Sequence, residues 1–148
     1  MISKDEILMG RDKKYPKEYT KEISDNIDKL LKIMNKVRTA YGKPMIVESG
    51  WRPAEINEGT SNAAKNSNHL KGLAVDIRDT DGSLWKWVLL NLNLMKELGI
   101  YLEDKRWTPI WVHFQMVPPK SKKRIYVPST KPAKADDIWD GKYDLKYN

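Results

Sequence analysis

The chain has 148 residues, 40% hydrophobic and 32% charged, which is the composition of one globular domain and excludes a disordered segment. It contains no cysteine, so disulfides and thiolate metal sites are excluded, and any zinc site must use His, Asp and Glu. The net charge of +7 favours a polyanionic partner: nucleic acid, anionic lipid or bacterial cell wall.

Targeting signals are not evident in the sequence. No apolar run approaches the ~20 residues that a membrane-spanning helix needs. The opening MISKDEILMGRDKKYP carries acids and lysines throughout, unlike a secretory signal. We therefore expect synthesis in a cytoplasm without membrane insertion, and release by another route if the target lies outside.

The first third of the chain predicts an arm, a helix and a strand. Residues 1–20 are polar and are expected to form an extended arm or a short turn. From Thr20 onward, apolar residues recur every three or four positions, which predicts an amphipathic helix that ends near Tyr41, with Gly42 at its C-terminal position. The segment PMIVESG, 44–50, then predicts a strand.

The middle of the chain predicts a long loop, a strand and a second helix. Residues 51–72 are polar and rich in Asn, Ser and Gly, and loops of this length in small domains are usually functional. The segment LAVDIRD, 73–79, predicts a strand. A second helix is expected over 83–98, with Ser83 as its cap and Gly99 as its terminator.

Two further strands are expected in IYLED, 100–104, and IWVHFQM, 110–116, joined by KRWTP in a hairpin-like connection. The basic run KSKKR, a short segment IYVPS and a tail rich in Lys, Pro and Asp follow. This order predicts an α+β fold, in which two main helices flank a small antiparallel central sheet.

The two histidines of the chain form a chemically sensible metal set with Asp76. A catalytic zinc ion usually has three protein ligands and one open position. His69 lies in the loop and Asp76 on the next strand, and the small Gly72 and Ala74 between them allow close approach of the backbone. If the strands of Asp76 and His113 are neighbours, both side chains face one cavity. Taken singly, each residue is more often structural, and the spacing does not decide between the two interpretations.

Several motifs that occur in the right order favour the metal-binding interpretation over the structural one. SNHLKGLAVD, 67–76, matches the pattern S-x-H-x-x-G-x-A-x-D, and WVH, 111–113, resembles a W-x-H segment. SGWRPAEIN, 49–57, resembles S-G-[YW]-R-x-x-x-x-N. These motifs resemble the zinc D-alanyl-D-alanine carboxypeptidase and L-alanyl-D-glutamate endopeptidase family, whose members cut bacterial cell-wall peptides. The likeness covers residues 45–115 and is strongest to the short members found in bacteriophages.

The resemblance implies that His69, Asp76 and His113 hold Zn²⁺ in a cleft on the sheet. Bound zinc would lower the pKa of its water to about 7 and polarise a carbonyl, which is the chemistry of amide hydrolysis. It also implies that Arg52 lines the cleft, where its donors bind a substrate carboxylate or the developing oxyanion. The alternative for Arg52 is a surface arginine tied to the following loop.

Three other residues are candidates for substrate binding or support. Ser67 is expected to orient the loop or the metal ligands. Trp111 and Gln115 share a strand face with His113 and are expected to contact substrate. Trp51 and Trp107 either wall the cleft or pack in the core.

The general base departs from the family pattern. Many members carry Glu or His three to six residues before the last histidine, but residues 107–110 read WTPI. The nearest carboxylates are Glu103 and Asp104. We favour Asp104 as the base if the turn folds back over the cleft, and Glu103 if the register differs. Alternatively, both are solvated turn residues paired with Lys105 or Arg106.

The leading hypothesis is a zinc metallopeptidase that hydrolyses an amide bond in peptidoglycan stem peptides, as a carboxypeptidase or endopeptidase. We expect it to be phage-encoded and to act at the cell wall after release, as an endolysin, or within a virion among virion proteins. The absence of the usual base motivates an alternative, a non-catalytic virion or wall-binding protein that keeps the fold. A nucleic-acid module rests only on the charge and KSKKR and is the weakest hypothesis.

The expected domain organisation follows from the resemblance. Residues 1–20 form the arm, 21–128 the zinc peptidase domain, and 129–148 the C-terminal tail.

Overall fold

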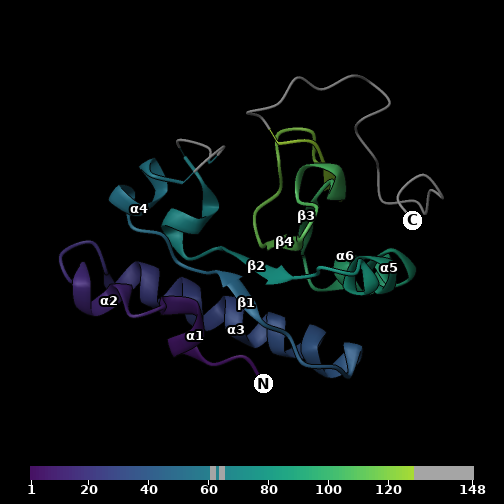
Figure 1. Ribbon diagram of the computed structural model, residues 1–148, viewed down its shortest axis with the longest axis horizontal. Helices are drawn as coiled ribbons and strands as arrows, with labels where there is room; N and C mark the ends of the chain where they lie inside the picture. Colours follow the sequence, from purple (N-terminus) through teal and green to yellow (C-terminus); the bar gives the residue numbers. More distant parts are fainter. Residues whose placement is uncertain (61–62, 64–65, 129–148) are drawn as a thin grey trace.

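Figure 1 shows a computed structural model of the chain, which describes residues 1–60, 63 and 66–128. The predicted tail, 129–148, lies outside the described residues. The elements are α1 (Lys4–Leu8), α2 (Arg11–Lys14), α3 (Lys21–Tyr41), β1 (Val47–Ser49), α4 (Ala54–Glu58), the 3₁₀ helix η1 (Asn68–Lys71), β2 (Ala74–Arg78), α5 (Ser83–Leu90), α6 (Leu92–Glu97), β3 (Tyr101–Glu103), the 3₁₀ helix η2 (Lys105–Trp107), β4 (Trp111–Gln115) and β5 (Ile125–Tyr126).

The five strands form one sheet in the order β1-β2-β4-β3-β5. Three of its strand pairs are antiparallel, and β3 and β5 are parallel. The predicted α+β class with a small central sheet is confirmed. The parallel pairing of β5 with β3 differs from the sequence prediction, because the expected sheet was entirely antiparallel.

Alternation along the strands gives the sheet one apolar and one polar face. The core-facing apolar side chains of β2, β3 and β4 are all fully buried: Val75, Ile77, Leu102, Val112 and Phe114. The residues between them in sequence project to the opposite face, so the chemically active side chains share one side of the sheet.

Helix α3 packs on the apolar face and is the element that the sequence predicts best. The hydroxyl of Thr20 accepts a hydrogen bond from the amide of Ile23, as an N-terminal cap should. The helix ends at Gly42, whose φ of 74° lies in the left-handed region that glycine adopts readily. Both ends agree with the sequence prediction.

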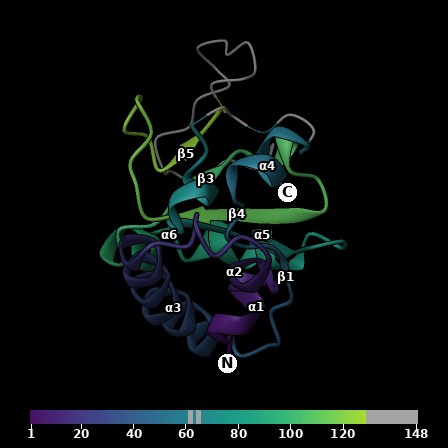
Figure 2. The same cartoon turned by 90° about the vertical axis from the view of Figure 1, so that its left-hand side faces the viewer.

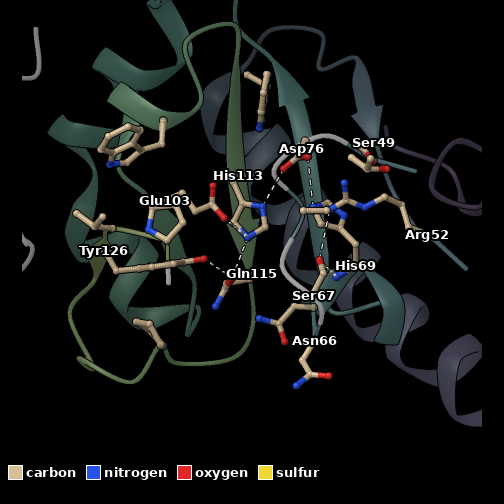
Figure 3. A pocket seen from close by; sticks show the side chains of 18 of the residues that line it. Ser49, Arg52, Asn66, Ser67, His69, Asp76, Glu103, His113, Gln115 and Tyr126 are labelled. Carbon is tan, nitrogen blue, oxygen red and sulfur yellow. Dashed lines mark hydrogen bonds and ion pairs between the residues drawn. The ribbon is translucent and has the colours of Figure 1, made fainter. Parts of the chain in front are cut away.

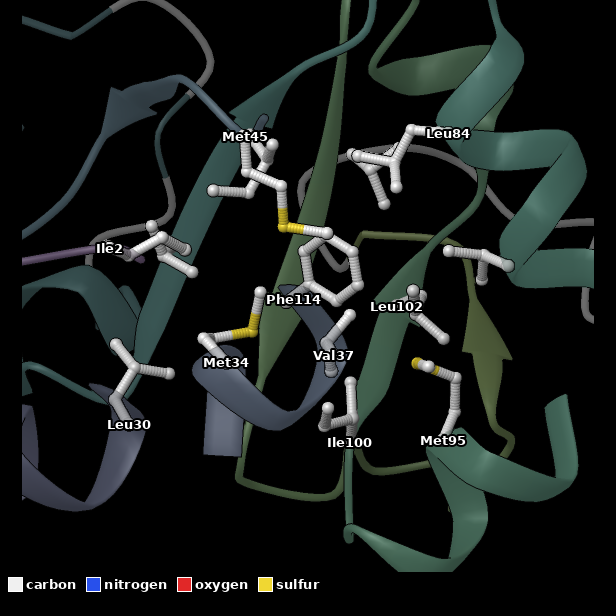
Figure 4. Close-up of a cluster of buried hydrophobic side chains, with 14 of the residues drawn as sticks. Ile2, Leu30, Met34, Val37, Met45, Leu84, Met95, Ile100, Leu102 and Phe114 are labelled. Carbon is white, nitrogen blue, oxygen red and sulfur yellow. The ribbon is translucent and has the colours of Figure 1, made fainter. Parts of the chain in front are cut away.

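The core joins α3 and the pair α5–α6 around one aromatic ring. Phe114 of β4 lies between Met34 and Val37 of α3 on one side and Leu84 and Met95 of α5–α6 on the other (Figure 4). The two main helical segments therefore both stabilise the same face of the sheet, which leaves the polar face free for a site.

The second predicted helix, 83–98, is interrupted at Asn91, which separates α5 from α6. The side-chain amide of Asn91 donates to the carbonyl of Trp87, and such local bonds compete with helix continuation. The prediction of Ser83 as the cap is wrong. Ser83 is the first helical residue, and the carboxylate of Asp79 accepts hydrogen bonds from two amides of the first turn.

The first twenty residues are not the extended arm or turn that we expected. They contain α1 and α2, and α1 contacts both α3 and β1. Ile7 is fully buried, and its carbonyl accepts a hydrogen bond of 2.9 Å from the amide of Trp51. A Cβ on Gly50 would collide with that same carbonyl group. The amino-terminal segment is thus packed tightly against the start of the long loop.

The long predicted loop, 51–72, contains two short helices. Its described residues include α4 and η1, and α4 lies across the sheet from α3, above the polar face (Figures 1 and 2). The predicted hairpin connection between β3 and β4 contains η2. None of the described helices combines the length and the apolar character that a bilayer crossing requires.

Candidate metal centre and active site

The structure brings His69, Asp76 and His113 together on the polar face of the sheet (Figure 3). Asp76 of β2 and His113 of β4 are direct partners on antiparallel strands, while His69 comes from η1. One candidate ligand atom from each of the three residues lies within 4.8 Å of the others, and all three residues are buried. The predicted neighbouring of the two strands is confirmed.

His69 is oriented by backbone contacts around its loop. Its Nδ1 donates to the carbonyl of Gly50 at 2.8 Å, which leaves Nε2 facing Oδ2 of Asp76 at 3.3 Å. The hydroxyl of Ser67 accepts a hydrogen bond from the amide of His69, so Ser67 caps η1 as a loop-orienting residue. Gly72 closes η1 with a φ of 72°, where a Cβ would lie 2.8 Å from Cγ1 of Ile27.

His113 is held at both ring nitrogens. Its Nδ1 lies 2.8 Å from Oδ1 of Asp76, and its Nε2 lies 2.8 Å from Oε1 of Gln115. The hydroxyl of Tyr126 donates to the same Gln115 oxygen, and the Gln115 amide group donates to the carbonyl of Val117 at 2.6 Å. Gln115 was predicted to bind substrate, but the structure gives both of its side-chain polar atoms partners within the protein.

The electrostatics of the cluster favour the charged forms of Asp76 and His113. Burial alone would raise the pKa of Asp76, but the His69 imidazole and the hydrogen bonds from His113 and His69 outweigh it and lower this pKa below its usual range. Burial would lower the pKa of His113, but the carboxylates of Glu103 and Asp76 raise it to about 9. Burial, reinforced by Glu103, raises the pKa of Tyr126 well above its usual value, so its hydroxyl keeps the proton that it donates.

These donors fit a single catalytic metal ion. The facing atoms are two imidazole nitrogens and a carboxylate, a ligand set found in zinc enzymes. The other nitrogen of each imidazole has its own acceptor: the Gly50 carbonyl for His69 and the Gln115 amide oxygen for His113. Such contacts hold a ligand ring in one orientation and one tautomer.

Arg52 contributes a buried cation beside the cluster. Only 8% of the residue is exposed, and its Nη2 donates to the hydroxyl of Ser67 at 3.3 Å. Its Nε is buried without a hydrogen-bond partner among the described residues. Burial lowers the pKa of Arg52 from its ordinary value, with Asp76 opposing the shift, but a guanidinium remains protonated in a protein. The structure therefore excludes the alternative of a solvent-exposed surface arginine.

The site opens into a cavity of about 660 Å³ on the polar face. Trp107 and Trp111 line it, as do Arg52 and Lys120. Trp51, for which packing was the alternative, is fully buried and does not line the cavity; its ring nitrogen donates to the carbonyl of Leu70. Two of the three candidate aromatic residues thus wall the cleft.

The structure places Glu103, and not Asp104, at the site. Asp104 is fully buried away from the cavity, and its carboxylate accepts hydrogen bonds from the backbone and the guanidinium of Arg106. Glu103 lines the cavity, with its Oε1 4.0 Å from Nε2 of His113. The preference for Asp104 is therefore corrected. The register that pairs Tyr101 with Gln115 turns Glu103 toward the polar face and Asp104 away from it.

Two contributors to the site were missed by sequence reasoning. The carbonyl of Gly50 carries no side-chain signal, although the glycine of the SGWR motif marks a position where another backbone segment approaches closely. Tyr126 lies in a two-residue strand beyond all the motifs, and no periodic pattern places so short a strand. By contrast, the position of Gln115 two residues after His113 on a strand places both on one face.

A buried His–Asp–His set lies on the wall of a cavity, with a cation and a carboxylate beside it, and this arrangement could hold a single metal ion of the kind that hydrolases use. The chain belongs to the peptidase M15 family, whose model matches residues 5–110. This family comprises zinc peptidases of the D-alanyl-D-alanine carboxypeptidase type. The match includes His69 and Asp76 and ends before His113. Comparisons with curated proteins and with solved structures returned no match.

Proposed function

We propose that this protein is a zinc metallopeptidase that hydrolyses an amide bond in the stem peptides of bacterial peptidoglycan. The observation that supports it most directly is the convergence of His69, Asp76 and His113 at one cavity in a chain of the peptidase M15 family. The likeness of the SNHLKGLAVD and WVH motifs to wall-cutting peptidases supports the choice of substrate. The net charge of +7 suits an anionic wall polymer.

The residues of the site have distinct roles in this proposal. Zinc held by the three ligands would act as a Lewis acid toward the scissile carbonyl and would activate water near neutral pH. Arg52 offers an unpaired Nε to a substrate carboxylate or to the oxygen on which negative charge develops. Trp107 and Trp111 give the peptide two aromatic walls.

Glu103 is the candidate general base. It takes a proton from the attacking water and returns it to the amide nitrogen as the C–N bond breaks, which leaves a carboxylate and an amine. Three observations favour it: it lines the cavity, it lies beside His113, and its carboxylate makes no hydrogen bond within the described part of the chain. Glu48 also lines the cavity, but its carboxylate is paired with Arg78 at 2.8 Å.

The geometry of the site weakens the case for a non-catalytic protein and for a nucleic-acid-binding module. A non-catalytic virion or wall-binding protein was suggested by the absence of a base near the last histidine, and Glu103 supplies a carboxylate there from the neighbouring strand. The nucleic-acid hypothesis gains no support, since the polar face carries a metal-ligand set. We propose a phage-encoded enzyme that reaches the wall after host lysis or within a virion.

Cleavage of purified peptidoglycan tests the proposal. We expect the zinc-loaded protein to release new amino termini, which mass spectrometry of the fragments would assign to one stem-peptide bond. His69→Ala should abolish both stoichiometric zinc and cleavage. Glu103→Gln should keep zinc and lose about 10²–10⁴-fold in rate, whereas the matched control Glu48→Gln should keep most activity. A zinc-replete protein that leaves the wall polymer intact, or one without stoichiometric zinc, would refute the proposal.

A further inference from the structure

The outer side of the His113 ring meets a pair of side chains that the metal motifs do not include. Nε2 of His113 lies 2.8 Å from Oε1 of Gln115, and the hydroxyl of Tyr126 donates to the same oxygen. All three residues are buried, with at most 9% of any one exposed to solvent. Figure 3 shows the three side chains in a row, on the side of His113 away from His69.

The orientation of the Gln115 amide is fixed by its partners. Its NH₂ group donates to the carbonyl of Val117 at 2.6 Å. A flipped amide would place two carbonyl oxygens in contact at that end, and it would present NH₂ hydrogens to His113 at the other. The oxygen of Gln115 must therefore face His113 and Tyr126.

An amide oxygen can only accept, so Nε2 of His113 carries the proton in this contact. Nδ1, which faces the Asp76 carboxylate at 2.8 Å, is then the nitrogen that would give up its proton to bind a metal ion. His69 has the reverse arrangement, because its Nδ1 donates to the Gly50 carbonyl and Nε2 remains. With a metal ion bound, the two imidazoles would therefore be opposite tautomers, each fixed by an acceptor outside the metal-ligand set.

Tyr126 reaches Gln115 only because β5 returns parallel to β3. The backbone of Tyr126 accepts a hydrogen bond of 2.8 Å from the amide of Asp104, and Arg124 accepts one of 2.9 Å from Leu102. Ile125 between them is fully buried in the core. These contacts give the hydroxyl a fixed position, so Tyr126 is an anchored donor.

We infer that Gln115 and Tyr126 are positioning residues that set the tautomer and orientation of His113 for metal binding. The inference rests on the proposed function, since it assumes that His113 is a ligand. Partners of this kind typically change metal affinity about 10–100-fold when removed. Gln115 acts directly on the ring, and Tyr126 acts through Gln115.

Zinc affinity gives the first test, measured by competition with a chromophoric chelator on the full chain. Gln115→Met keeps the length of the side chain and removes the acceptor, and we expect the dissociation constant to rise about 10–100-fold. Gln115→Glu keeps an acceptor toward His113 but sets a second oxygen against the Val117 carbonyl, so it should bind zinc more tightly than Gln115→Met and less tightly than the unaltered protein. Tyr126→Phe should cause a smaller loss, whereas the matched control Tyr41→Phe, which removes a hydroxyl near Ser83, should cause none.

Nitrogen NMR gives a readout that a merely structural role would not move. The chain has only two histidines, so ¹⁵N-histidine labelling yields two imidazoles to assign. In the zinc-loaded protein we expect an Nδ1–H tautomer for His69 and an Nε2–H tautomer for His113. In Gln115→Met, the His113 Nε2–H should exchange faster with water, while the His69 signals stay in place.

The outcomes separate this inference from the proposed function. If the unaltered protein binds no zinc, both are overturned. If it binds zinc and Gln115→Met matches it in affinity and in His113 Nε2–H protection, only the positioning role is overturned. Equal weakening by Gln115→Met and Gln115→Glu would also overturn it, because shape and not acceptance would then explain the effect.

Discussion

Arg52 is a buried cation that contributes little to the stability of the fold. Its guanidinium has one side-chain hydrogen bond, to Ser67, and a buried Nε without a partner in the described part of the chain. Desolvating such a group costs free energy that neighbouring charges return only in part. We therefore expect Arg52 to act on a ligand in the cavity that it lines. Replacing it should lower catalytic activity and leave the stability of the fold unchanged or higher.

We predict that Arg52→Met lowers kcat/KM about 10²–10³-fold, because the donor for a carboxylate or oxyanion is lost. The melting temperature should stay level or rise, since a desolvated charge gives way to an apolar side chain of similar length. Steady-state assays and thermal denaturation of the same preparations check both effects, with Arg38→Met on α3 as a control that should change neither much. A fall in melting temperature at unchanged kcat/KM would assign Arg52 to the fold.

At the residue scale, the sequence located the three candidate metal ligands but favoured the carboxylate that does not line the cavity. His69, Asp76 and His113 fall in short motifs, and strand alternation alone predicts their faces. The choice between Glu103 and Asp104 depends on the register of β3 against β4, which no local pattern specifies. A slip of one residue exchanges the faces of consecutive carboxylates, and the structure has the register that favours Glu103.

Among the elements, the segment 50–52 links the amino-terminal helices to the metal centre. On one side, the amide of Trp51 donates to Ile7, and Nη1 of Arg11 donates to the Trp51 carbonyl at 2.7 Å. On the other, the Gly50 carbonyl accepts from His69. The segment is held between α1–α2 and η1, so a displacement of its backbone would also displace the imidazole of His69.

We predict that Gly50→Ala weakens zinc binding and destabilises the protein by more than about 2 kcal/mol, because a Cβ there collides with the Ile7 backbone. Chemical denaturation in chelator measures the stability, and chelator competition measures the metal affinity. Gly59→Ala is a matched control: its added Cβ would meet only ordinary contacts at 3.7 Å. Normal stability and affinity in Gly50→Ala would contradict this account of the segment.

The elements differ in how well the sequence predicts them, for physical reasons. The 21 residues of α3 repeat an apolar stripe many times, so its period is unmistakable. Helices α1 and α2 have five and four residues, too few to show a period, and α1 depends on the burial of Ile7 against distant elements. The interruption at Asn91 depends on one side-chain bond. β5 has two residues and is defined only by its partner.

At the scale of the whole molecule, the buried charges of the site make stability depend on pH. The pKa of His113 is raised from 6.5 to about 9, so its contribution is complete below about pH 6.5 and is lost as the pH rises through 9. The pKa of Asp76 is lowered, so its contribution is present above about pH 4 and is lost as the pH falls. The two together favour stability in weakly acidic solution.

We predict that, in the presence of a chelator, the free energy of unfolding falls between pH 6.5 and 9.5, by at most about 1.4 kcal/mol per pH unit from this group. Urea denaturation at a series of pH values measures it. His113→Asn removes the titrating imidazole and should show a flatter profile over the same range. Parallel profiles for the two proteins would exclude His113 as the source of the dependence.

Because β5 pairs with β3 and carries Tyr126, the shortest segment that contains the complete site extends beyond the last metal-ligand motif, WVH. An excised fragment that stopped after Gln115 would retain all three ligands, yet it would lack the Tyr126 hydroxyl and leave β3 with an open edge. Open edges invite pairing between molecules. Anyone grafting this centre onto another scaffold, or trimming the chain for crystallisation, should therefore carry the polypeptide through Tyr126.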